Sequence, residues 1–253
     1  MPEPVAAARC LESRSAWPPH ANCRPIAERF GALGASVVVN YTASEQQAWE
    51  TVGAIERLGG TAIAVQADIS KVADIDRLFA TTIERYGRLD IVVANAGIER
   101  VGIPLADVTE SDYDQVFDVN TRGAFFTLRG AAKHIADDGR IIYVGSSSTA
   151  FPRPGYALYS ASKMAPLLFV KVLAKELGAR GVTVNSILPT VIAGAGLSTS
   201  EVRPQAREFI QAFNPMQRAG TVQDVADAAE YLASDLSAFV SGQQLKLSGG
   251  GPA

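Results

Sequence analysis

The sequence predicts a single α/β domain, built as a doubly wound parallel sheet with helices on both faces. Three observations predict it. The chain has 253 residues, a length at which one α/β unit buries a full core. From about Pro25 onward, helical patterns alternate with short apolar runs through short connections. No internal repeat and no linker interrupts this alternation, so we expect one domain.

The first predicted elements alternate between helix and strand. A helix is expected over 26–33, because its apolar residues recur at helical spacing and Gly34 follows them. The β-branched run 37–39 then predicts a buried strand. Ser44 is expected to cap the next helix, and paired glycines end that helix before a strand over 61–66.

The same pattern continues to the C-terminus. Gly87 is expected to end a helix that begins near Ala73. The remaining predicted elements, in chain order, are a strand over 89–93, helices around 111–116 and 121–135, a strand over 140–144, a helix over 159–177, a strand over 183–188, a helix over 221–232 and a strand over 244–247. In such folds, ligands bind beyond the carboxyl ends of the strands, where the strand order reverses.

Composition narrows the class of protein. Hydrophobic residues make up 47% of the chain and charged residues 19%, as in a compact globular enzyme. A net charge of -3 with scattered basic residues argues against a nucleic-acid partner. No stretch approaches ~20 apolar residues, so we expect no membrane span and a cytoplasmic location. Cys10 and Cys23 do not suggest a disulfide framework, and no metal site is predicted.

The run 159–163 contains the most informative chemistry. Tyr159 and Lys163 are four residues apart at the start of a predicted helix, so their side chains share one face. An ammonium group there favours phenolate and is expected to lower the pKa of Tyr159 toward the range of an acid/base catalyst. Ser146 follows a strand, thirteen residues before the tyrosine, where its hydroxyl can bond a substrate oxygen. Ser147 and Ser148 are alternatives that the spacing favours less.

Two further motifs stand where the same chemistry needs them. The run Asn95-Ala96-Gly97 follows a predicted strand, and Asn120 stands at the start of a long helix. With these motifs in place, the chain from Pro25 to its C-terminus resembles the classical short-chain dehydrogenase/reductase family, which has a Rossmann-like fold. It is most similar to the branch that includes 3-oxoacyl-carrier-protein reductases.

This resemblance implies a catalytic tetrad. Tyr159 would exchange a proton with the substrate oxygen while hydride passes between nicotinamide and carbon. Ser146 would polarise that oxygen, and Lys163 would lower the pKa of Tyr159 and bind the nicotinamide ribose. Asn120 would hold a water that relays protons to Lys163, although it could instead only satisfy backbone groups at a helix start.

The resemblance also implies cofactor-binding positions. Asp68 would contact the adenine with Ile69 beside it, and Asn95 and Gly97 would lie at the adenosine ribose. Pro189 and Thr190 would face the nicotinamide amide, alongside Tyr159 and Lys163. The family usually has Pro-Gly where this chain has Pro189-Thr190.

Asn40 bears on the choice between the two nicotinamide cofactors. The second strand ends in Val39-Asn40-Tyr41, without the carboxylate that binds the ribose hydroxyls of NAD. The absence of a carboxylate leaves room for the 2′-phosphate of NADP, so NADP(H) is favoured over NAD. The other interpretation is that Asn40 is only a strand-end residue.

The N-terminal segment 1–24 departs from the family. The expected Thr-Gly-x-x-x-Gly-x-Gly turn would fall at about 16–23, a stretch that contains no glycine. Glycines there allow the backbone to approach the pyrophosphate at a helix N-terminus. Either this segment is encoded out of frame or from a displaced start, or it is a natural replacement. We predict that Val5 to Leu11 fills the place of the central first strand.

Outside the cofactor region, the sequence predicts a substrate lid over 190–220. On the other side of the pocket, four residues suggest an apolar or ring-bearing carbonyl or alcohol substrate: Phe151, Pro152, Pro154 and Tyr156. The run 164–170 is hydrophobic beyond one helical stripe, and with the resemblance it implies a homo-oligomer, a tetramer or a dimer.

Two functions from different classes therefore stand side by side. The first is an NADP(H)-dependent oxidoreductase with a complete tetrad. The second is a cofactor-free pseudoenzyme or scaffold subunit that keeps the fold and the tetrad but binds nucleotide weakly, because it lacks the glycine-rich turn. A damaged gene product is a third interpretation.

Overall fold

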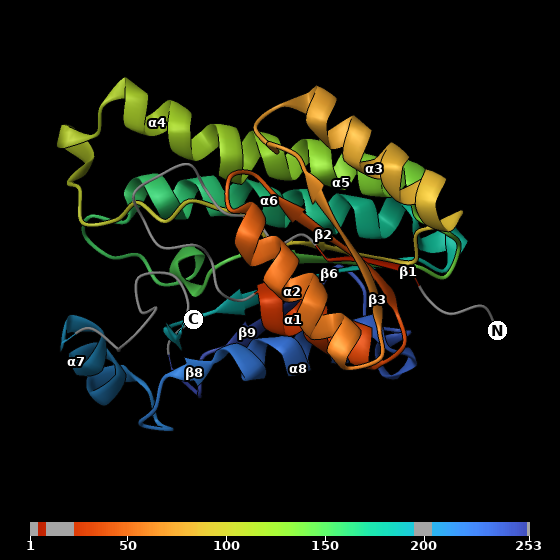
Figure 1. The fold of residues 1–253 in the computed structure, drawn as a ribbon. Helices are drawn as coiled ribbons and strands as arrows, with labels where there is room; N and C mark the ends of the chain where they lie inside the picture. The colour runs from red at the N-terminus through yellow and green to blue at the C-terminus, as the bar shows by residue number, and fades with distance from the viewer. Residues whose placement is uncertain (1–4, 9–22, 195–203, 252–253) are drawn as a thin grey trace.

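The computed structural model describes residues 5–8, 23–194 and 204–251, and it shows a seven-stranded parallel sheet between two layers of helices (Figure 1). The strand order is β3-β2-β1-β4-β5-β6-β9. The strands are β1 (Val5–Ala8), β2 (Ser36–Tyr41), β3 (Thr61–Gln66), β4 (Ile91–Ala94), β5 (Arg140–Val144), β6 (Thr183–Pro189) and β9 (Gln244–Leu247). This confirms the doubly wound fold.

Helices cover both faces of the sheet. One apolar core joins it to α1 (Cys23–Ala32), α2 (Glu45–Arg57) and α8 (Val222–Ala233). The other core joins it to α3 (Val72–Tyr86), α5 (Ala124–His134) and α6 (Ala157–Glu176). The helix α4 (Glu110–Phe117) precedes a π-helical turn over Asp118–Gly123 that leads into α5.

The central place in the sheet is filled by β1, as predicted. It pairs in parallel with β2 through Val5↔Ser36 and with β4 through Ala6↔Ile91 to Ala8↔Val93. The strand order reverses between β1 and β4, which puts the expected ligand crevice beside the carboxyl end of β1. The rest of the predicted strand, Arg9 to Leu11, lies outside the described residues, as does the stretch 16–22.

Two local expectations need correction. Ser44 is the N-cap residue of α2, but its side chain makes no capping hydrogen bond, so that role was wrong. The helix predicted over 121–135 is interrupted, since the π-helical turn precedes α5. By contrast, Gly87 ends α3 as expected, with a left-handed φ of 74° that favours glycine.

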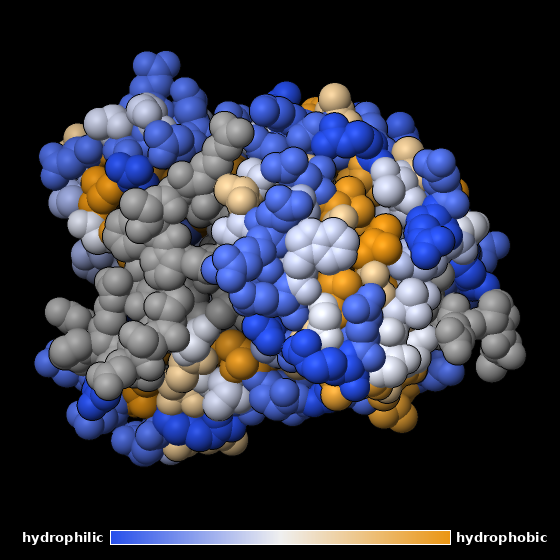
Figure 2. Space-filling model, in the orientation of Figure 1, coloured by the Kyte–Doolittle hydropathy of each residue, from blue (hydrophilic) through white to orange (hydrophobic). Residues whose placement is uncertain are grey.

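The predicted lid region contains three described elements. The strands β7 (Ile192–Ala193) and β8 (Gly220–Thr221) pair in parallel, and α7 (Pro204–Phe213) lies between them in the chain. Residues 195–203 of this region lie outside the described part of the chain. The face shown in Figure 2 is mostly hydrophilic, with small hydrophobic patches between polar residues.

The expectation that no stretch is long and apolar enough to span a membrane was wrong. By length and composition alone, α6 is a helix that could cross a membrane, with a mean hydropathy of 1.3 over its best window. A single such helix is weak evidence, because core helices pass the same test. Here α6 packs on the sheet and buries Tyr159 and Lys163, as expected for a core helix.

Candidate active site

The predicted site residues gather along the carboxyl edge of the sheet. Asp68, Asn95, Ser146 and Thr190 each follow the end of a strand, namely β3, β4, β5 and β6. In parallel strands, these ends lie on one edge, so residues up to 122 positions apart in sequence meet there. Tyr159 and Lys163 reach this edge from the first turns of α6.

The buried face of α6 presents the catalytic pair. Its buried residues recur at helical spacing, so that Tyr159, Ser162 and Lys163 all point to the sheet. Tyr159 is 6% exposed and Lys163 is 2% exposed. The pair is therefore part of the interior, which excludes the interpretation as a surface pair.

Ser146 is held at the end of β5 by a short helical turn. It is the N-cap residue of the 3-10 turn over Ser147–Thr149, where its Oγ accepts a hydrogen bond from the Ser148 backbone N–H at 3.2 Å. The same hydroxyl donates to Ser148 Oγ at 3.0 Å, and it acts to lower the pKa of Tyr159. Of the three candidate serines, Ser146 is the one that acts on the pKa of the tyrosine.

Asn120 lies in the π-helical turn and is completely buried. Its Oδ1 accepts from the Ile98 N–H at 2.7 Å, and its Nδ2 donates to the Ile98 carbonyl at 2.9 Å. Nδ2 also donates to Ser162 Oγ at 2.9 Å, and that hydroxyl donates to the Tyr159 carbonyl at 2.7 Å. Asn120 thus ties the loop after β4 to the helix that carries Tyr159.

A proline in α6 explains a second hydrogen bond between the π-helical turn and α6. Pro166 has no N–H, so the helix offers no donor from that position to the carbonyl of Ser162, four residues earlier. Thr121 Oγ1 donates to this carbonyl at 2.9 Å. The π-helical turn therefore supplies the donor that the helix lacks, and it is fixed against α6 by that bond.

The Lys163 ammonium reaches back to the sheet. Its Nζ donates to the Val144 carbonyl at 3.2 Å and lies 5.5 Å from the centre of the Tyr143 ring. The loop after β4 passes close by, since a Cβ built on Gly97 would be 2.7 Å from Nζ. Only glycine fits at this position while Lys163 keeps its place.

Burial dominates the electrostatics of the pair. It raises the pKa of Tyr159 well above the ordinary 10; Glu99 adds to the rise, and the hydrogen bond with Ser146 opposes it. The expected lowering by Lys163 was therefore wrong for this arrangement. Burial also lowers the pKa of Lys163 from 10.5 to about 8, against an opposite effect of Glu99. Lys163 can thus exchange a proton near neutral pH.

On the adenosine side, Asn40 holds the ends of two strands together. It is completely buried, and its Nδ2 donates to the carbonyls of Val65 and Ala67 at 3.0 and 3.1 Å. Among the described residues, its Oδ1 has no hydrogen-bond partner. The structure thus gives Asn40 the role of a strand-end residue, and at this position the argument for NADP is the missing carboxylate alone.

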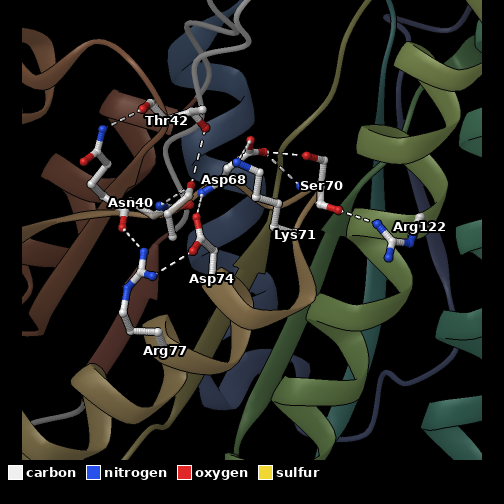
Figure 3. Close-up of polar contacts among 10 residues, drawn as sticks. Asn40, Thr42, Asp68, Ser70, Lys71, Asp74, Arg77 and Arg122 are labelled. Carbon is white, nitrogen blue, oxygen red and sulfur yellow. Dashed lines mark hydrogen bonds and ion pairs between the residues drawn. The ribbon is translucent and has the colours of Figure 1, made fainter.

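Asp68 is fixed in the turn between β3 and α3 (Figure 3). Its Oδ1 accepts from the Ser70 N–H at 3.1 Å and from the Ser70 hydroxyl at 2.7 Å. Its own N–H donates to Asp74 Oδ2 at 2.9 Å, which lowers the pKa of Asp74. Arg122 from the π-helical turn donates to the Ser70 carbonyl, so this turn also contacts the loop that holds Asp68.

The other cofactor positions differ in how they are held. Ile69 is buried, and a Cβ on Gly123 would come 2.8 Å from its Cδ1. Asn95 Nδ2 donates to the Cys23 sulfur at 3.0 Å. Pro189 ends β6, and the Thr190 N–H donates to the Leu247 carbonyl at 3.1 Å. Amide and hydroxyl groups at this edge fit the ribose and carboxamide of a nicotinamide cofactor.

One predicted pocket residue contacts the predicted lid region. Phe213 at the end of α7 lies 5.8 Å from Phe151, measured between ring centres. The two rings bring together the lid and the loop before α6. Within the described residues, no group of three His, Cys, Asp or Glu side chains is placed to hold a metal ion.

Comparisons with known proteins agree with this geometry. Residues 23–251 match the family model described as enoyl-(acyl carrier protein) reductase. The chain is 41% identical over 239 residues to a short-chain dehydrogenase/reductase of Pestalotiopsis microspora, covering 89% of each chain. The chain belongs to the short-chain dehydrogenase/reductase family. It is therefore an oxidoreductase by family.

Two other members of this family are informative. A hydroxynaphthalene reductase-like protein of Metarhizium brunneum is 37% identical over 242 residues, covering 89% of this chain and 88% of its own length. The structure of a short-chain dehydrogenase from Burkholderia cenocepacia in complex with NADP matches with a TM-score of 0.86 at 32% identity, covering 97% of each chain.

Sequence reasoning missed three residues of this short-chain dehydrogenase/reductase site. Ser162 links Asn120 to Tyr159, Glu99 acts on the pKa of both Tyr159 and Lys163, and Tyr143 lies against Lys163. For Ser162, the helical spacing to Tyr159 was a usable signal. For the other two, no signal was available, because their contacts join separate elements.

Proposed function

We propose that this chain is an NADP(H)-dependent oxidoreductase that transfers hydride between a nicotinamide and a carbonyl or secondary-alcohol substrate. The observation that carries the proposal is the gathering of buried Tyr159, Lys163 and Asn120 with the partly exposed Ser146 at the carboxyl edge of the sheet. In that position, a phenol, a hydroxyl and an ammonium group can act on one substrate oxygen.

In the proposed reaction, each residue has a distinct role. A bound nicotinamide would supply or accept the hydride. Tyr159 gives a proton to the substrate oxygen in reduction and takes it back in oxidation, and Ser146 donates a hydrogen bond to that oxygen. Lys163 would bind the nicotinamide ribose. Asn120 would hold a water that passes protons to Lys163.

The preference for NADP(H) over NAD has two supports. The end of β2 carries Asn40 in place of a carboxylate, which removes a repulsion toward a 2′-phosphate. A relative with the same fold is described in complex with NADP. Asp68, Ile69, Asn95 and Gly97 would line the adenosine half of the site, and Pro189 and Thr190 the nicotinamide amide.

We further propose a ring-bearing carbonyl substrate. The contact of Phe151 with Phe213 places two aromatic rings between the proposed lid and the loop before α6. The similarity to a hydroxynaphthalene reductase-like protein points to the same class. A flat aromatic ketone would stack on these rings with its oxygen directed toward Tyr159.

The test is a calorimetric titration of the purified chain with NADPH and then NADH. A matched variant carries a restored glycine-rich turn in place of residues 16–23. Micromolar binding of NADPH by the unmodified chain, followed by reduction of a naphthol-type ketone, is the expected result. Absence of binding by the unmodified chain, with binding by the variant, would contradict the proposal for this chain.

That contradicting outcome would favour the second candidate, a pseudoenzyme or scaffold subunit without cofactor. The specific observation behind it is the absence of glycine from 16–23, which removes the usual amide cradle for the pyrophosphate. Such a chain would keep the tetrad as inherited structure.

We also propose a homo-oligomer in the cytoplasm. Phe125 on α5 and the residues Met164, Leu168 and Val172 on α6 are exposed large hydrophobic side chains, and the α6 residues recur every four positions on one face. A second copy would cover this stripe. Light scattering of the wild type and of Leu168→Glu tests it, since the variant should be monomeric; cell fractionation tests the location.

A further inference from the structure

Tyr143 occupies the floor of the site beneath Lys163. It is completely buried on β5, where its register neighbours are Ala94 on β4 and Ser186 on β6. These small neighbours leave room for the ring on this face of the sheet. A Cβ at position 145 would lie 3.3 Å from the ring, so the glycine there leaves space beside it.

The Lys163 ammonium lies over that ring. Its distance to the ring centre is 5.5 Å, within the ~6 Å range of a cation–π contact. The hydrogen bond to Val144 uses one of three ammonium donors. Because burying a charge is costly without partners, an attractive ring face matters more here than at the surface.

We infer that Tyr143 is a positioning residue for Lys163, whose ring holds the ammonium group in the site and favours its charged form. The ring is responsible and the hydroxyl is not. Among the described residues, the Tyr143 hydroxyl has no hydrogen-bond partner. Phenylalanine should therefore replace tyrosine here without loss.

Other titratable groups act at the same place. Tyr159 on α6 raises the pKa of Tyr143, as does burial, so that Tyr143 stays neutral. Glu99, in the loop after β4, raises the pKa of Lys163. Neither group is altered by substitutions at Tyr143, so a change in Lys163 can be assigned to the ring.

The test is the pH titration of Lys163 by NMR in the full chain labelled with 13C-lysine, its signal being assigned by loss in Lys163→Met. The wild-type midpoint is expected near 8. Tyr143→Phe should keep it, and Tyr143→Leu should lower it by about one pH unit. Tyr86→Leu, which removes a ring from α3, is the matched control and should leave the midpoint unchanged.

A second series covers the case in which Tyr143→Leu does not fold. Phenylalanines with one, two and three ring fluorines at this position keep the shape of the ring but weaken its π face. The Lys163 midpoint should fall stepwise along the series. An unchanged midpoint in the leucine variant, or no trend in the fluorinated series, would overturn the inference.

The significance of Tyr143 for catalysis rests on the proposed function, whereas the NMR titration reads Lys163 directly. The two can therefore fail separately. If Tyr143→Leu lowers the midpoint and the chain reduces a carbonyl, the kcat of this variant should fall about 10-fold while its KM changes little. The loss of activity on the alkaline side should also begin at a lower pH than in the wild type, because Lys163 loses its proton earlier.

Discussion

The catalytic end of the sheet and its first strand contrast in how they are held. Tyr159 and Lys163 are fixed by contacts with β5, the loop after β4 and the π-helical turn. The strand β1 is four residues long and pairs with β2 and β4 through backbone hydrogen bonds. Among the described residues, the contacts of the tetrad come from elements after β1, whereas the centre of the sheet depends on β1 itself.

Because of this difference, we expect catalysis and folding stability to depend on separate parts of the molecule. Changes at the catalytic end should alter reactivity while the fold persists. Changes at β1 should alter the fold first, because unpaired strands in the middle of a sheet leave buried backbone groups without partners. The four predictions below test that separation, from the largest expected effect to the smallest.

Deletion of residues 2–12 should have the largest effect. It removes β1 and the pairing partner of both β2 and β4. With each lost hydrogen bond costing about 1 kcal/mol, we expect the melting temperature to fall by ~10 °C or more. Calorimetry measures it, with deletion of residues 2–4 alone as the control. An unchanged melting temperature would mean that β1 does not contribute.

Tyr159→Phe should abolish most of the turnover without affecting the fold. The variant keeps the buried ring but loses the hydroxyl that moves the proton, so kcat should fall by about 10³-fold. Tyr231→Phe, at a half-exposed position on α8, is the control. Steady-state kinetics and melting temperature are measured together; a variant that retains a tenth of the activity would exclude Tyr159 as the acid.

The charge of Lys163 should appear in the pH dependence of stability. Its pKa is about 8 in the folded chain against an ordinary 10.5, so the unfolded chain binds more protons between these values. The free energy of unfolding should therefore rise with pH across this window, by ~3 kcal/mol.

Denaturant titrations of the wild type and Lys163→Met from pH 7.5 to 10.5 measure this rise. The variant should lack it, because methionine does not titrate. Lys171→Met, at an exposed position of the same helix, should behave as the wild type. An equal rise in all three proteins would show that Lys163 has an ordinary pKa in the folded chain.

Thr121 and Pro166 should show a coupled effect. In the wild type, Thr121→Val leaves the Ser162 carbonyl without its donor and should cost about 1–2 kcal/mol of stability. In a Pro166→Ala background, the new N–H can bond that carbonyl within α6, so the same change should cost little. A double-mutant cycle by chemical denaturation measures the coupling; strict additivity would contradict it.

Much of the fold and the site could be predicted from the sequence. The local spacing of apolar residues predicts the alternation of helices and strands, and the strands β3, β5 and β9 lie at the expected positions. Helical spacing indicates that Tyr159 and Lys163 share a face, and the resemblance of several motifs together added Ser146 and Asn120 as candidates. The place of β1 followed from the need to pair its two neighbours.

The remaining features could not be predicted, because they join distant segments. The pKa of Tyr159 was expected to fall beside Lys163, yet burial raises it. Burial depends on how α6 packs on the sheet, which no local pattern specifies. Likewise, the contacts that hold the π-helical turn, from Asn120 and Thr121 to other elements, cannot be inferred from its own residues.

The sequence by itself determined the order of helices and strands, the family and a set of candidate site residues. The order of elements follows from periodicity, which acts within a few residues, whereas the family and the candidates follow from the resemblance of several motifs taken together. Only the tertiary structure decided that Tyr143 lies under Lys163, that Asn120 binds both Ile98 and Ser162, and that Asn40 joins β2 to β3. These contacts arise when the strands align in parallel and bring their carboxyl ends to one edge, where burial and close approach set the charge states.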